Sequence, residues 1–456
     1  MEKLADEDVR RETREIRKVA FASFTGTAIE FYDFYIYGTA AALVFGTVFF
    51  PELSSVSGTL AALATFGVAF FARPLGGVIF GHYGDKVGRK TMLIFSLLLM
   101  GLSTFLVGLL PGYATIGVAA AVLLVILRFL QGIGLGGEWG GAVLMAAEHA
   151  PPSKRGFYTS FPQVGPSIGF LLSNGSFLLL TATLSKEQFA SWGWRMPFLL
   201  SIVLVGIGLF IRARVAETPV FKRVMETRTE ARVPVMDMVR TYPLVLALAS
   251  GAAILVFGFF YILTVFSVSY GTTNLGLPNT TMLYCTIISI VFMSIGVPIF
   301  AVLSDSVGRR NIYLVGSALA GLWAFPMFWL FDTKNPAFIA LALSVGMVFF
   351  AMMYGPMAAF FSELFGTRVR YSGASVSYSL GGILGAALAP TIATQLLSAT
   401  GTSLSISLYI AIMALITFVC TFLLSETYLT DLSSIRSEER RLITEGSTTG
   451  KHKTSR

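Results

Sequence analysis

Five ionisable residues stand well inside long apolar stretches of this 456-residue chain, where a charged side chain is costly to bury. Carboxyl groups in such positions can take up and release a proton, and arginines there can neutralise them or bind an anionic solute. The sequence therefore supplies candidate proton-carrying and anion-binding groups in an apolar setting. These five residues are Glu30, Asp33, Arg73, Arg128 and Glu138.

The acidic residues Glu30 and Asp33 are three positions apart, so they share one face of a helix. Two carboxylates that lie close together in a low dielectric are not expected both to be ionised, so one is expected to hold a proton at neutral pH. Arg73 or Arg128 would neutralise the ionised carboxylate or contact a substrate anion, and competition between the two would couple proton uptake to substrate binding. The alternative is a static ion-pair network that only holds helices together.

The composition is that of a membrane protein. Hydrophobic residues make up 55% of the chain and charged residues 13%, whereas soluble proteins carry about a quarter. The net charge of +8 does not indicate nucleic-acid binding, because the basic residues lie in short segments between apolar stretches. Cys285 and Cys420 each lie within an apolar stretch, which excludes a disulfide framework.

Apolar stretches long enough to cross a bilayer as helices recur twelve times. They predict an all-α membrane protein with an N-terminal tail (1–18), a six-helix bundle (19–213), a central loop (214–242), a second six-helix bundle (243–425) and a C-terminal tail (426–456). The expected spans are 19–48, 58–83, 91–110, 116–147, 157–182, 195–213, 243–270, 280–304, 311–331, 336–362, 372–397 and 404–425.

Basic residues orient these spans. Of the 33 Lys and Arg residues, 28 fall in the tails and loop segments of one side, Arg212 among them at the start of the segment 212–242. Only Lys186 and Lys334 fall in the opposite loops. The positive-inside rule then predicts that both termini are cytoplasmic. At about 1.5 Å per residue, the acidic residues and Arg73 lie about 15–21 Å from that face, at one level near the midplane, while Arg128 lies in the outer half.

The two halves of the sequence resemble each other. The loop Gly81–Lys90 and the loop 301–310 align at an offset of 220, and a Glu and an Arg seven residues apart recur between spans 4–5 and 10–11. Such a repeat predicts two bundles related by a pseudo-two-fold axis, with the substrate between them. The candidate gating residues are Gly81, Asp85, Gly88, Arg89, Lys90, Glu148, Arg155, Asp305, Gly308, Arg309, Glu363 and Arg370.

The repeated loop has a physical use. Glycine permits the sharp turn between two antiparallel helices. The aspartate can accept hydrogen bonds at a neighbouring helix N-terminus, and the arginine can pair with it or with lipid phosphate. A plain topological anchor is the alternative.

These loops resemble the signature of the major facilitator superfamily, with Lys86 where that family usually has arginine. Further motifs are similar to those of its metabolite:proton symporter family, which includes bacterial permeases for shikimate, 2-oxoglutarate, citrate and proline or betaine. The resemblance covers essentially the whole chain and implies a bacterial cytoplasmic membrane. The motifs are Glu30-Phe-Tyr-Asp-Phe34, Arg73-Pro-Leu-Gly-Gly77, the segment Arg128–Gly141, and Trp192-Gly-Trp-Arg-Met-Pro-Phe198.

Substrate contacts are expected from both halves. No acidic or basic residue occurs in 243–304 or 371–425, so the second half is expected to supply shape and neutral contacts. Gln163 would face the central cavity or make a plain helix–helix hydrogen bond, and the arginines would contact substrate or serve structure. The candidate substrate-binding residues are Arg73, Arg128, Gln163, Tyr32, Tyr261 and Tyr354, with Tyr270, Tyr378 and Gln395 as further candidates in the second half.

The predicted function is proton-coupled import of a small polar metabolite, an organic acid such as shikimate or a di- or tricarboxylate. A symporter of zwitterionic osmolytes such as proline or betaine, a proton-driven efflux antiporter and a transporter-like sensor are the alternatives. The segment Gly446–His452 lacks the spacing of a phosphate loop, so no ATP-driven enzyme is expected. We expect a monomer in the lipid bilayer with no cofactor or metal, no nucleic-acid partner, and the proton as coupling ion.

Overall fold

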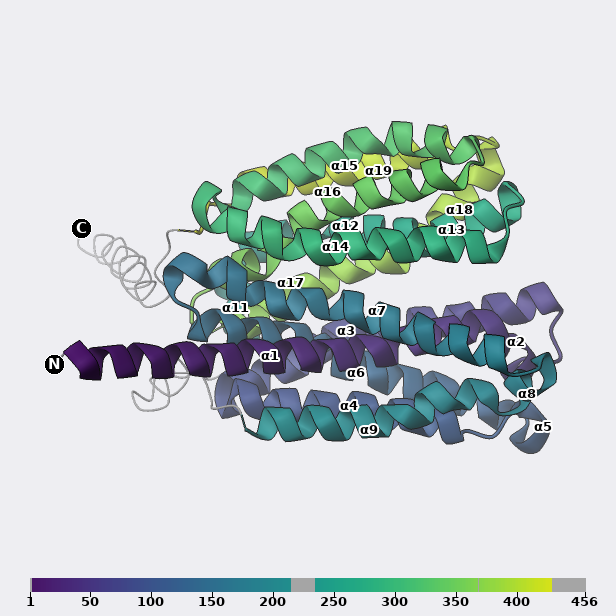
Figure 1. Ribbon diagram of the computed structural model, residues 1–456, viewed down its shortest axis with the longest axis horizontal. Helices are drawn as coiled ribbons and strands as arrows, with labels where there is room; N and C mark the ends of the chain where they lie inside the picture. The colour runs from purple at the N-terminus through teal and green to yellow at the C-terminus, as the bar shows by residue number, and fades with distance from the viewer. Residues whose placement is uncertain (1, 215–233, 368, 429–456) are drawn as a thin grey trace, which may run out of the picture.

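The computed structural model describes residues 2–214, 234–367 and 369–428, and these residues form helices and no strand. Figure 1 shows two helical bundles side by side, one from each half of the chain. The predicted all-α fold with two bundles is therefore confirmed. Most of the predicted central loop and nearly all of the predicted C-terminal tail lie outside the described residues.

The first bundle starts with a helix that is longer than its predicted span, because it begins at Glu2 rather than at residue 19. A π-helical segment, η1, follows it directly. The elements of this half are α1 (Glu2–Ala40), η1 (Ala41–Phe45), α2 (Gly46–Phe49), α3 (Ser55–Val87), α4 (Arg89–Leu109), α5 (Tyr113–Ile116), α6 (Val118–His149), η2 (Pro152–Lys154), α7 (Arg155–Thr183), α8 (Lys186–Ser191), η3 (Gly193–Arg195) and α9 (Met196–Ala213).

The second bundle repeats this arrangement, and π-helical segments interrupt its first and fifth predicted spans. A short helix, α11, precedes it. The elements are α11 (Pro234–Thr241), α12 (Pro243–Tyr261), η4 (Ile262–Phe266), α13 (Ser267–Ser269), η5 (Tyr270–Asn274), α14 (Asn279–Val307), α15 (Arg309–Asp332), α16 (Pro336–Glu363), α17 (Arg370–Gly382), η6 (Ile383–Ala387), α18 (Ala389–Thr400) and α19 (Leu404–Leu423).

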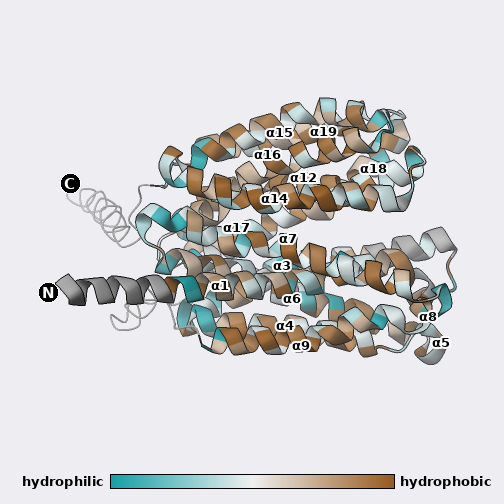
Figure 2. Ribbon diagram, in the orientation of Figure 1, coloured by the Kyte–Doolittle hydropathy of each residue, from teal (hydrophilic) through white to brown (hydrophobic). Residues whose placement is uncertain are grey.

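The surface of the bundles is apolar. Eleven helices among the described residues are long and apolar enough to cross a membrane, and α1, which carries Glu30 and Asp33, packs beside them against α6, α7 and α9. Figure 2 shows apolar residues along the length of both bundles. Large apolar side chains face outward, with exposed fractions of 60% for Phe71, 68% for Leu322 and 69% for Trp329. Such a surface suits hydrocarbon rather than water, so the chain is a multi-pass membrane protein.

The repeated loops form two equivalent turns. Gly88 joins α3 to α4 with φ of 120°, and Gly308 joins α14 to α15 with φ of 106°. Residues with a side chain rarely adopt such positive φ angles, so the prediction that glycine permits these sharp turns is confirmed. The N-terminus of α1 lies at the same end of the molecule (Figure 1). We call this the loop end.

The halves meet along a few helices. α7 packs against α14 and α16 of the other half, and α17 packs against α3 and α6. At this interface a Cβ on Gly81 would lie 2.8 Å from the Cα of Ser372, so glycine lets α3 and α17 approach closely. Side chains from both halves therefore enclose the molecular centre.

Candidate functional site

One arginine joins two buried carboxylates inside the first bundle. Arg212 of α9 donates through Nη1 to Glu30 Oε1 of α1 at 3.2 Å, and its Nη2 contacts Glu138 Oε1 of α6. Ser96 of α4 donates to the other oxygen of Glu138 at 3.1 Å. The three charged side chains are at most 5% exposed. Four helices thus converge on a group of two acids and one base, which we call the charged triad.

Local packing explains how Arg212 reaches the triad. A Cβ on Gly26 of α1 would overlap its guanidinium, so glycine at this position leaves the necessary space. The same guanidinium donates to the carbonyl oxygen of Leu93 at 2.5 Å. The charge count groups Arg212 with the basic loop segment 212–242, but its side chain is buried within the first bundle. Arg212 lies in the last turn of α9. The side chain of an arginine at the end of an apolar helix can point into the bundle when a buried carboxylate is there to pair with it.

Asp33 stands apart from the triad. Its side chain is fully buried, and neither of its carboxylate oxygens has a hydrogen-bond partner among the described residues. No hydrogen bond in the described part of the chain joins it to Glu30. The expected acidic pair of Glu30 and Asp33 is thus replaced by Glu30 and Glu138, because Arg212 binds those two carboxylates together across three helices.

Arg128 and Arg73 contact aromatic rings rather than acids. The Arg128 guanidinium carbon lies 4.4 Å from the centroid of the Phe34 ring and 4.1 Å from that of Tyr37. The Arg73 carbon lies 4.6 Å from the Phe34 centroid and 4.3 Å from that of Phe70. Neither arginine forms an ion pair within the described residues, so the expectation that they neutralise the carboxylates is wrong in this conformation. Arg212 has that role.

Arg128 is also held by neighbouring amides. It donates to Oε1 of Gln131 at 3.0 Å, and Gln131 donates to Oγ1 of Thr104 at 2.7 Å. Its Nε and Nη2 have no hydrogen-bond partner in the described structure. Arg128 is therefore oriented on one side by an amide and on the others by rings, as a buried cation without a counter-ion.

A small cavity lies between the halves and includes Arg73. Arg73 is the only charged residue among those that line it, and four tyrosines surround it. Of the predicted substrate contacts, Arg73, Tyr261 and Tyr354 line this cavity, as does Tyr378, while Tyr35 was not predicted. The lining residues are Phe31, Tyr35, Arg73, Pro166, Val256, Phe257, Phe260, Tyr261, Met293, Phe350, Tyr354 and Tyr378.

The other predicted contacts do not line this cavity: Tyr270 donates to Asp332 at 2.5 Å, and Gln395 is exposed. Tyr32 donates to the carbonyl oxygen of Pro197 at 3.2 Å within the first half. Gln163 donates to the carbonyl oxygen of Tyr354 at 2.7 Å and accepts from Nε1 of Trp139 at 2.6 Å. Of the two interpretations left open for Gln163, the helix–helix hydrogen bond is the one observed, because its amide bonds Trp139 in its own half and Tyr354 in the other. Arg128 does not line the cavity either.

The first signature loop bridges the halves at the loop end. Asp85 Oδ2 accepts hydrogen bonds from the backbone N–H and the hydroxyl of Ser372, at 3.2 and 3.0 Å, near the N-terminus of α17. Glu148 pairs with Arg89 of its own half at 3.1 Å and with Arg370 of the other half at 3.3 Å. The aspartate thus caps a helix of the opposite half, as the sequence predicted.

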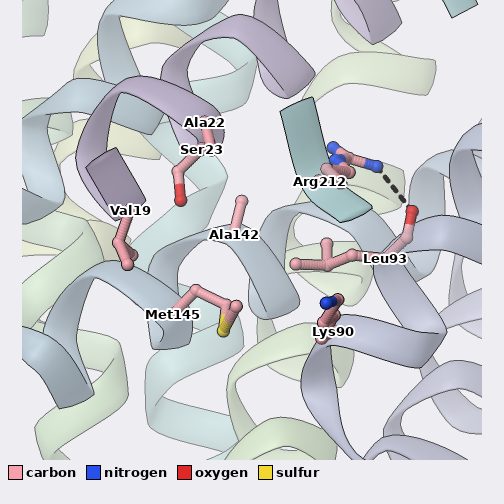
Figure 3. A pocket seen from close by; sticks show the side chains of 8 residues that line it. All are labelled: Val19, Ala22, Ser23, Lys90, Leu93, Ala142, Met145 and Arg212. Atoms are coloured by element: carbon pink, nitrogen blue, oxygen red, sulfur yellow. Dashed lines mark hydrogen bonds between the residues drawn. The ribbon is translucent and has the colours of Figure 1, made fainter. Parts of the chain in front are cut away.

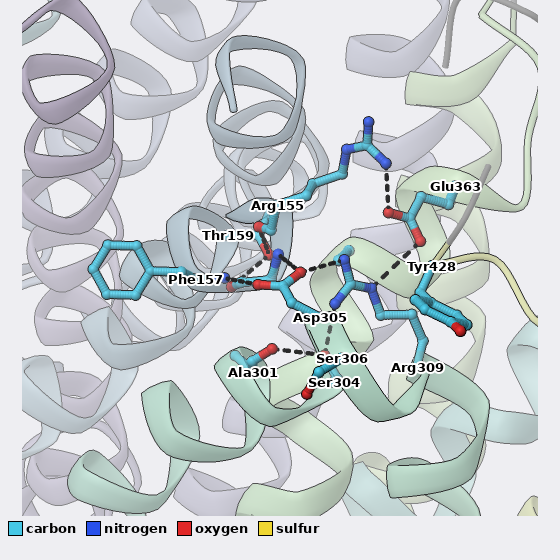
Figure 4. A network of polar contacts seen from close by, with 12 residues as sticks. Arg155, Phe157, Thr159, Ala301, Ser304, Asp305, Ser306, Arg309, Glu363 and Tyr428 are labelled. Atoms are coloured by element: carbon cyan, nitrogen blue, oxygen red, sulfur yellow. Dashed lines mark hydrogen bonds and ion pairs between the residues drawn. The ribbon is translucent and has the colours of Figure 1, made fainter. Parts of the chain in front are cut away.

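The second signature loop makes the equivalent bridge (Figure 4). Asp305 accepts from the backbone N–H groups of Gly156 and Phe157 at the start of α7, at 2.8 and 3.1 Å, and pairs with Arg309 at 2.6 Å. Glu363 pairs with Arg155 of the first half at 2.8 Å and with Arg309 at 3.5 Å. The contacts of the Asp85 loop with Glu148 and those of the Asp305 loop with Glu363 therefore hold the two halves together. We call these two sets of contacts the clamps.

The other predicted loop residue, Lys90, makes a contact within its own half, since it donates to the carbonyl oxygen of Ala213 at 2.8 Å.

Between the clamps and the cavity, Tyr371 donates to the carbonyl oxygen of Gly137 at 2.7 Å, and the rings of Trp139 and Tyr378 stack with centroids 3.9 Å apart. Hydrogen bonds and ion pairs between the halves, in the described part of the chain, lie at this end or near the centre. The loop end is therefore closed.

Among the described residues no group of three His, Cys, Asp or Glu side chains is placed to hold a metal ion. Apart from Asp33, Arg128 and the ion pairs of the two loops, the buried charges form two arrangements. One is the charged triad in the first bundle, and the other is Arg73 facing the cavity between the bundles.

Comparison with known proteins agrees with this architecture. The inner membrane metabolite transport protein YhjE of Escherichia coli K12 is 46% identical over 415 residues, covering 90% of this chain and 94% of that protein. The shikimate transporter of the same strain is 40% identical over 423 residues, covering 90% and 95%. Its proline/betaine transporter is 33% identical over 422 residues, covering 91% and 84%.

A solved structure has the same fold. The proton:xylose symporter XylE, bound to 6-bromo-6-deoxy-D-glucose, superposes with a TM-score of 0.75 over 91% of this chain and 97% of that one, at 17% identity. A family model described as the Major Facilitator Superfamily matches residues 23–384. Two bundles clamped by repeated loops, buried charges between their helices, and relatives named as metabolite transporters lead to one conclusion: the chain belongs to the Major Facilitator Superfamily and is a membrane transporter of metabolites.

Proposed function

We propose that this transporter is a proton symporter that imports a small organic acid by alternating access. The single observation that carries the coupling is that Glu30 and Glu138 share one guanidinium, that of Arg212, in a buried site. With both carboxyls ionised the triad has a net charge of −1, and an uncompensated buried charge is strongly unfavourable. One proton makes the triad neutral, so its natural partner is a single exchangeable proton.

The cavity favours an anionic substrate. Arg73 is 3% exposed, and its Nε and Nη2 have no hydrogen-bond partner among the described residues. A substrate carboxylate can accept bonds from such a guanidinium in bidentate geometry. The hydroxyls of Tyr261, Tyr354 and Tyr378 can bind hydroxyl groups of the substrate, and the phenylalanine rings suit its apolar face. A compact hydroxylated carboxylic acid combines these features.

A zwitterionic osmolyte is the second candidate, because the aromatic lining also suits a quaternary ammonium group. Phe31, Phe257, Phe260 and Phe350 line the cavity together with the tyrosines. Cations bind to the faces of such rings. In both candidates Arg73 binds the carboxylate, so the two differ in what the rings contact.

The direction of transport follows from the predicted topology. The excess of basic residues in the loops and tails on one side makes the loop end cytoplasmic in this proposal. Since the loop end is closed, the conformation described would be the one that receives substrate and proton from outside, in the inner membrane of a bacterium. Opening of the two clamps would then release the substrate to the cytoplasm.

The test is uptake by proteoliposomes containing the purified protein. The solutes are shikimate, 2-oxoglutarate, citrate and betaine, each with and without an imposed inward proton gradient. We expect one carboxylic acid to accumulate only with the gradient. Accumulation of betaine would favour the second candidate, and equal uptake with and without the gradient would contradict proton coupling.

Acidic variants separate the two possible proton sites. Glu30→Gln should abolish gradient-driven accumulation while leaving exchange of labelled for unlabelled substrate, because the triad then has no proton to exchange. Asp33→Asn is the matched comparison, three residues along the same helix. If Asp33→Asn alone abolishes accumulation, the coupling proton belongs to Asp33 and not to the triad.

A further inference from the structure

A second cavity lies within the first bundle, on the loop-end side of the charged triad. Helices α1, α4, α6 and α9 line it with Val19, Ala22, Ser23, Lys90, Leu93, Ala142, Met145 and Arg212. Figure 3 shows these side chains around one space, with the Arg212 guanidinium bonded to the Leu93 carbonyl. The cavity is large enough to hold a water molecule, and within a mostly apolar lining Ser23, Lys90 and Arg212 are the residues that can bond to it.

This cavity ends at the triad. Arg212 lines it with the same guanidinium that binds Glu30 and Glu138. The cavity therefore reaches within one side chain of the two carboxylates. At the other end, Lys90 is partly exposed and donates to the carbonyl oxygen of Ala213, the last residue of α9. The space thus leads from the triad toward the loop end.

The second cavity is separate from the one between the halves. The two share no lining residue. The cavity between the halves, which we call the substrate cavity, is closed toward the loop end. The stacked rings of Trp139 and Tyr378, the Tyr371 hydrogen bond and the two clamps close it. A proton on the triad and a solute beside Arg73 would therefore face different paths to the same side of the membrane.

We propose that the cavity inside the first bundle is the exit path of the coupling proton to the loop end, and that Arg212 is its gate. The inference rests on the proposed proton symport. The groups that face the path are the cations Lys90 and Arg212, and behind Arg212 lie Glu30 and Glu138, with Ser96 bonded to the latter. While Arg212 stays paired, its positive charge repels a hydronium ion.

The motion of the gate is a change of partners. When Arg212 leaves the protonated carboxyl group of the triad, that group becomes open to water in the cavity, gives its proton to the water and becomes a carboxylate. No other reactant is needed, since the proton passes from a carboxyl oxygen to water and the remaining carboxylate keeps the guanidinium. Solute release requires the clamps to open, whereas proton release requires only movement of one side chain.

Filling the path tests this inference. Ala142→Leu places a larger side chain in the cavity, and Ala142→Ser at the same position keeps the space and adds a hydroxyl. We expect the leucine variant to slow gradient-driven uptake, and the proton flux recorded with a pH-sensitive dye, at least several-fold, with substrate exchange unchanged. The serine variant should match the wild type in all three. Equal loss of uptake and exchange in the leucine variant, or no loss of either, would overturn the proposal.

Thiol accessibility gives a readout that does not depend on transport. In a chain with Cys285 and Cys420 replaced by alanine, Ser23→Cys should react with Ag⁺ added on the loop-end side, as counted by the thiols left for a maleimide dye. Val256→Cys, in the substrate cavity, should react with Ag⁺ from the opposite side only. A Ser23→Cys thiol that is protected from the loop end contradicts the path, whereas wild-type uptake that ignores the proton gradient contradicts the proposed symport itself.

Discussion

The two halves of this transporter are alike at the loop end and unlike inside the membrane. At the loop end, the Asp85 and Asp305 loops make the same contacts, each capping a helix of the opposite half. Inside, the first half buries six charged residues, whereas 243–304 and 371–425 contain none. The six are Glu30, Asp33, Arg73, Arg128, Glu138 and Arg212.

The clamps are therefore built from residues of both halves, whereas the charged triad is built from residues of the first half. The clamps join the halves reciprocally, since Glu148 binds Arg370 and Glu363 binds Arg155, so each depends on residues of both repeats. The charged triad lies wholly within the first bundle, and its ion pairs among the described residues all join helices of that bundle. A duplicated chain can therefore keep its clamps symmetric while one half acquires the buried charges and the other supplies aromatic surface.

The largest expected effect comes from a change in the charged triad. Arg212→Gln leaves Glu30 and Glu138 buried without a cation, and removal of one partner from a buried ion pair destabilises a protein by about 3–5 kcal/mol. We expect a lower melting temperature in detergent and loss of gradient-driven uptake. Arg214→Gln, two residues along and exposed, is the control and should behave as the wild type.

A double variant sharpens this prediction. Glu138→Gln added to Arg212→Gln removes one of the two uncompensated acids, so part of the lost stability should return. Melting curves of the single and double variants give the coupling. If Arg212→Gln alone melts like the wild type, the triad does not hold α1, α6 and α9 together.

The next effect compares two arginines that share the ring of Phe34. Arg73→Gln removes a charge-assisted hydrogen bond to substrate, worth about 1.5–3 kcal/mol, or roughly 10- to 100-fold in affinity. Arg128→Gln should weaken substrate binding much less, because Arg128 does not line the cavity. Substrate protection against thermal unfolding measures both. Equal losses would show that the two cations form one binding site.

A smaller effect should be equal in the two halves. Asp85→Ala and Asp305→Ala each remove a helix cap between the halves, a change of about 0.5–2 kcal/mol. A reporter Ser375→Cys, buried at the interface in the cysteine-free background, should react faster with a maleimide from the loop end in both variants. A large effect of one aspartate and none of the other would contradict the symmetry of the clamps.

Which features could be predicted from the sequence depends on how far apart along the chain the interacting residues are. The membrane spans, the sharp glycine turns and the capping aspartates depend on local sequence patterns and on a visible repeat, so they could be predicted. Arg212 could not, because it is 182 residues from Glu30 along the chain and stands where an apolar helix meets a basic loop. An arginine at such a boundary can extend to the lipid headgroups or turn inward.

The rotation of each helix about its axis also could not be predicted from the sequence. The sequence placed Glu30 and Asp33 on one face, yet only Glu30 points to the triad. Tyr32, between them, is bonded within its own half instead of facing the cavity, whereas Tyr35, one turn on, lines it. Periodicity gives the relative direction of two side chains on a helix, but the direction of the face itself depends on packing with α6, α7 and α9.

The smallest expected effect tests whether the clamps are fully equivalent. Glu426, just after α19, accepts from the backbone N–H groups of Arg309 and Arg310 at 2.9 and 3.1 Å, and Thr427 donates to Glu363 at 2.7 Å. A carboxylate at a helix N-terminus contributes about 0.3–1 kcal/mol, so Glu426→Gln should raise the labelling rate of Ser375→Cys about two- to fivefold. Asp305→Ala should mask this increase, because both changes loosen the same clamp, while Asp85→Ala should add to it. Full additivity with both aspartates would mean that Glu426 only anchors the end of α19 and takes no part in closing the loop end.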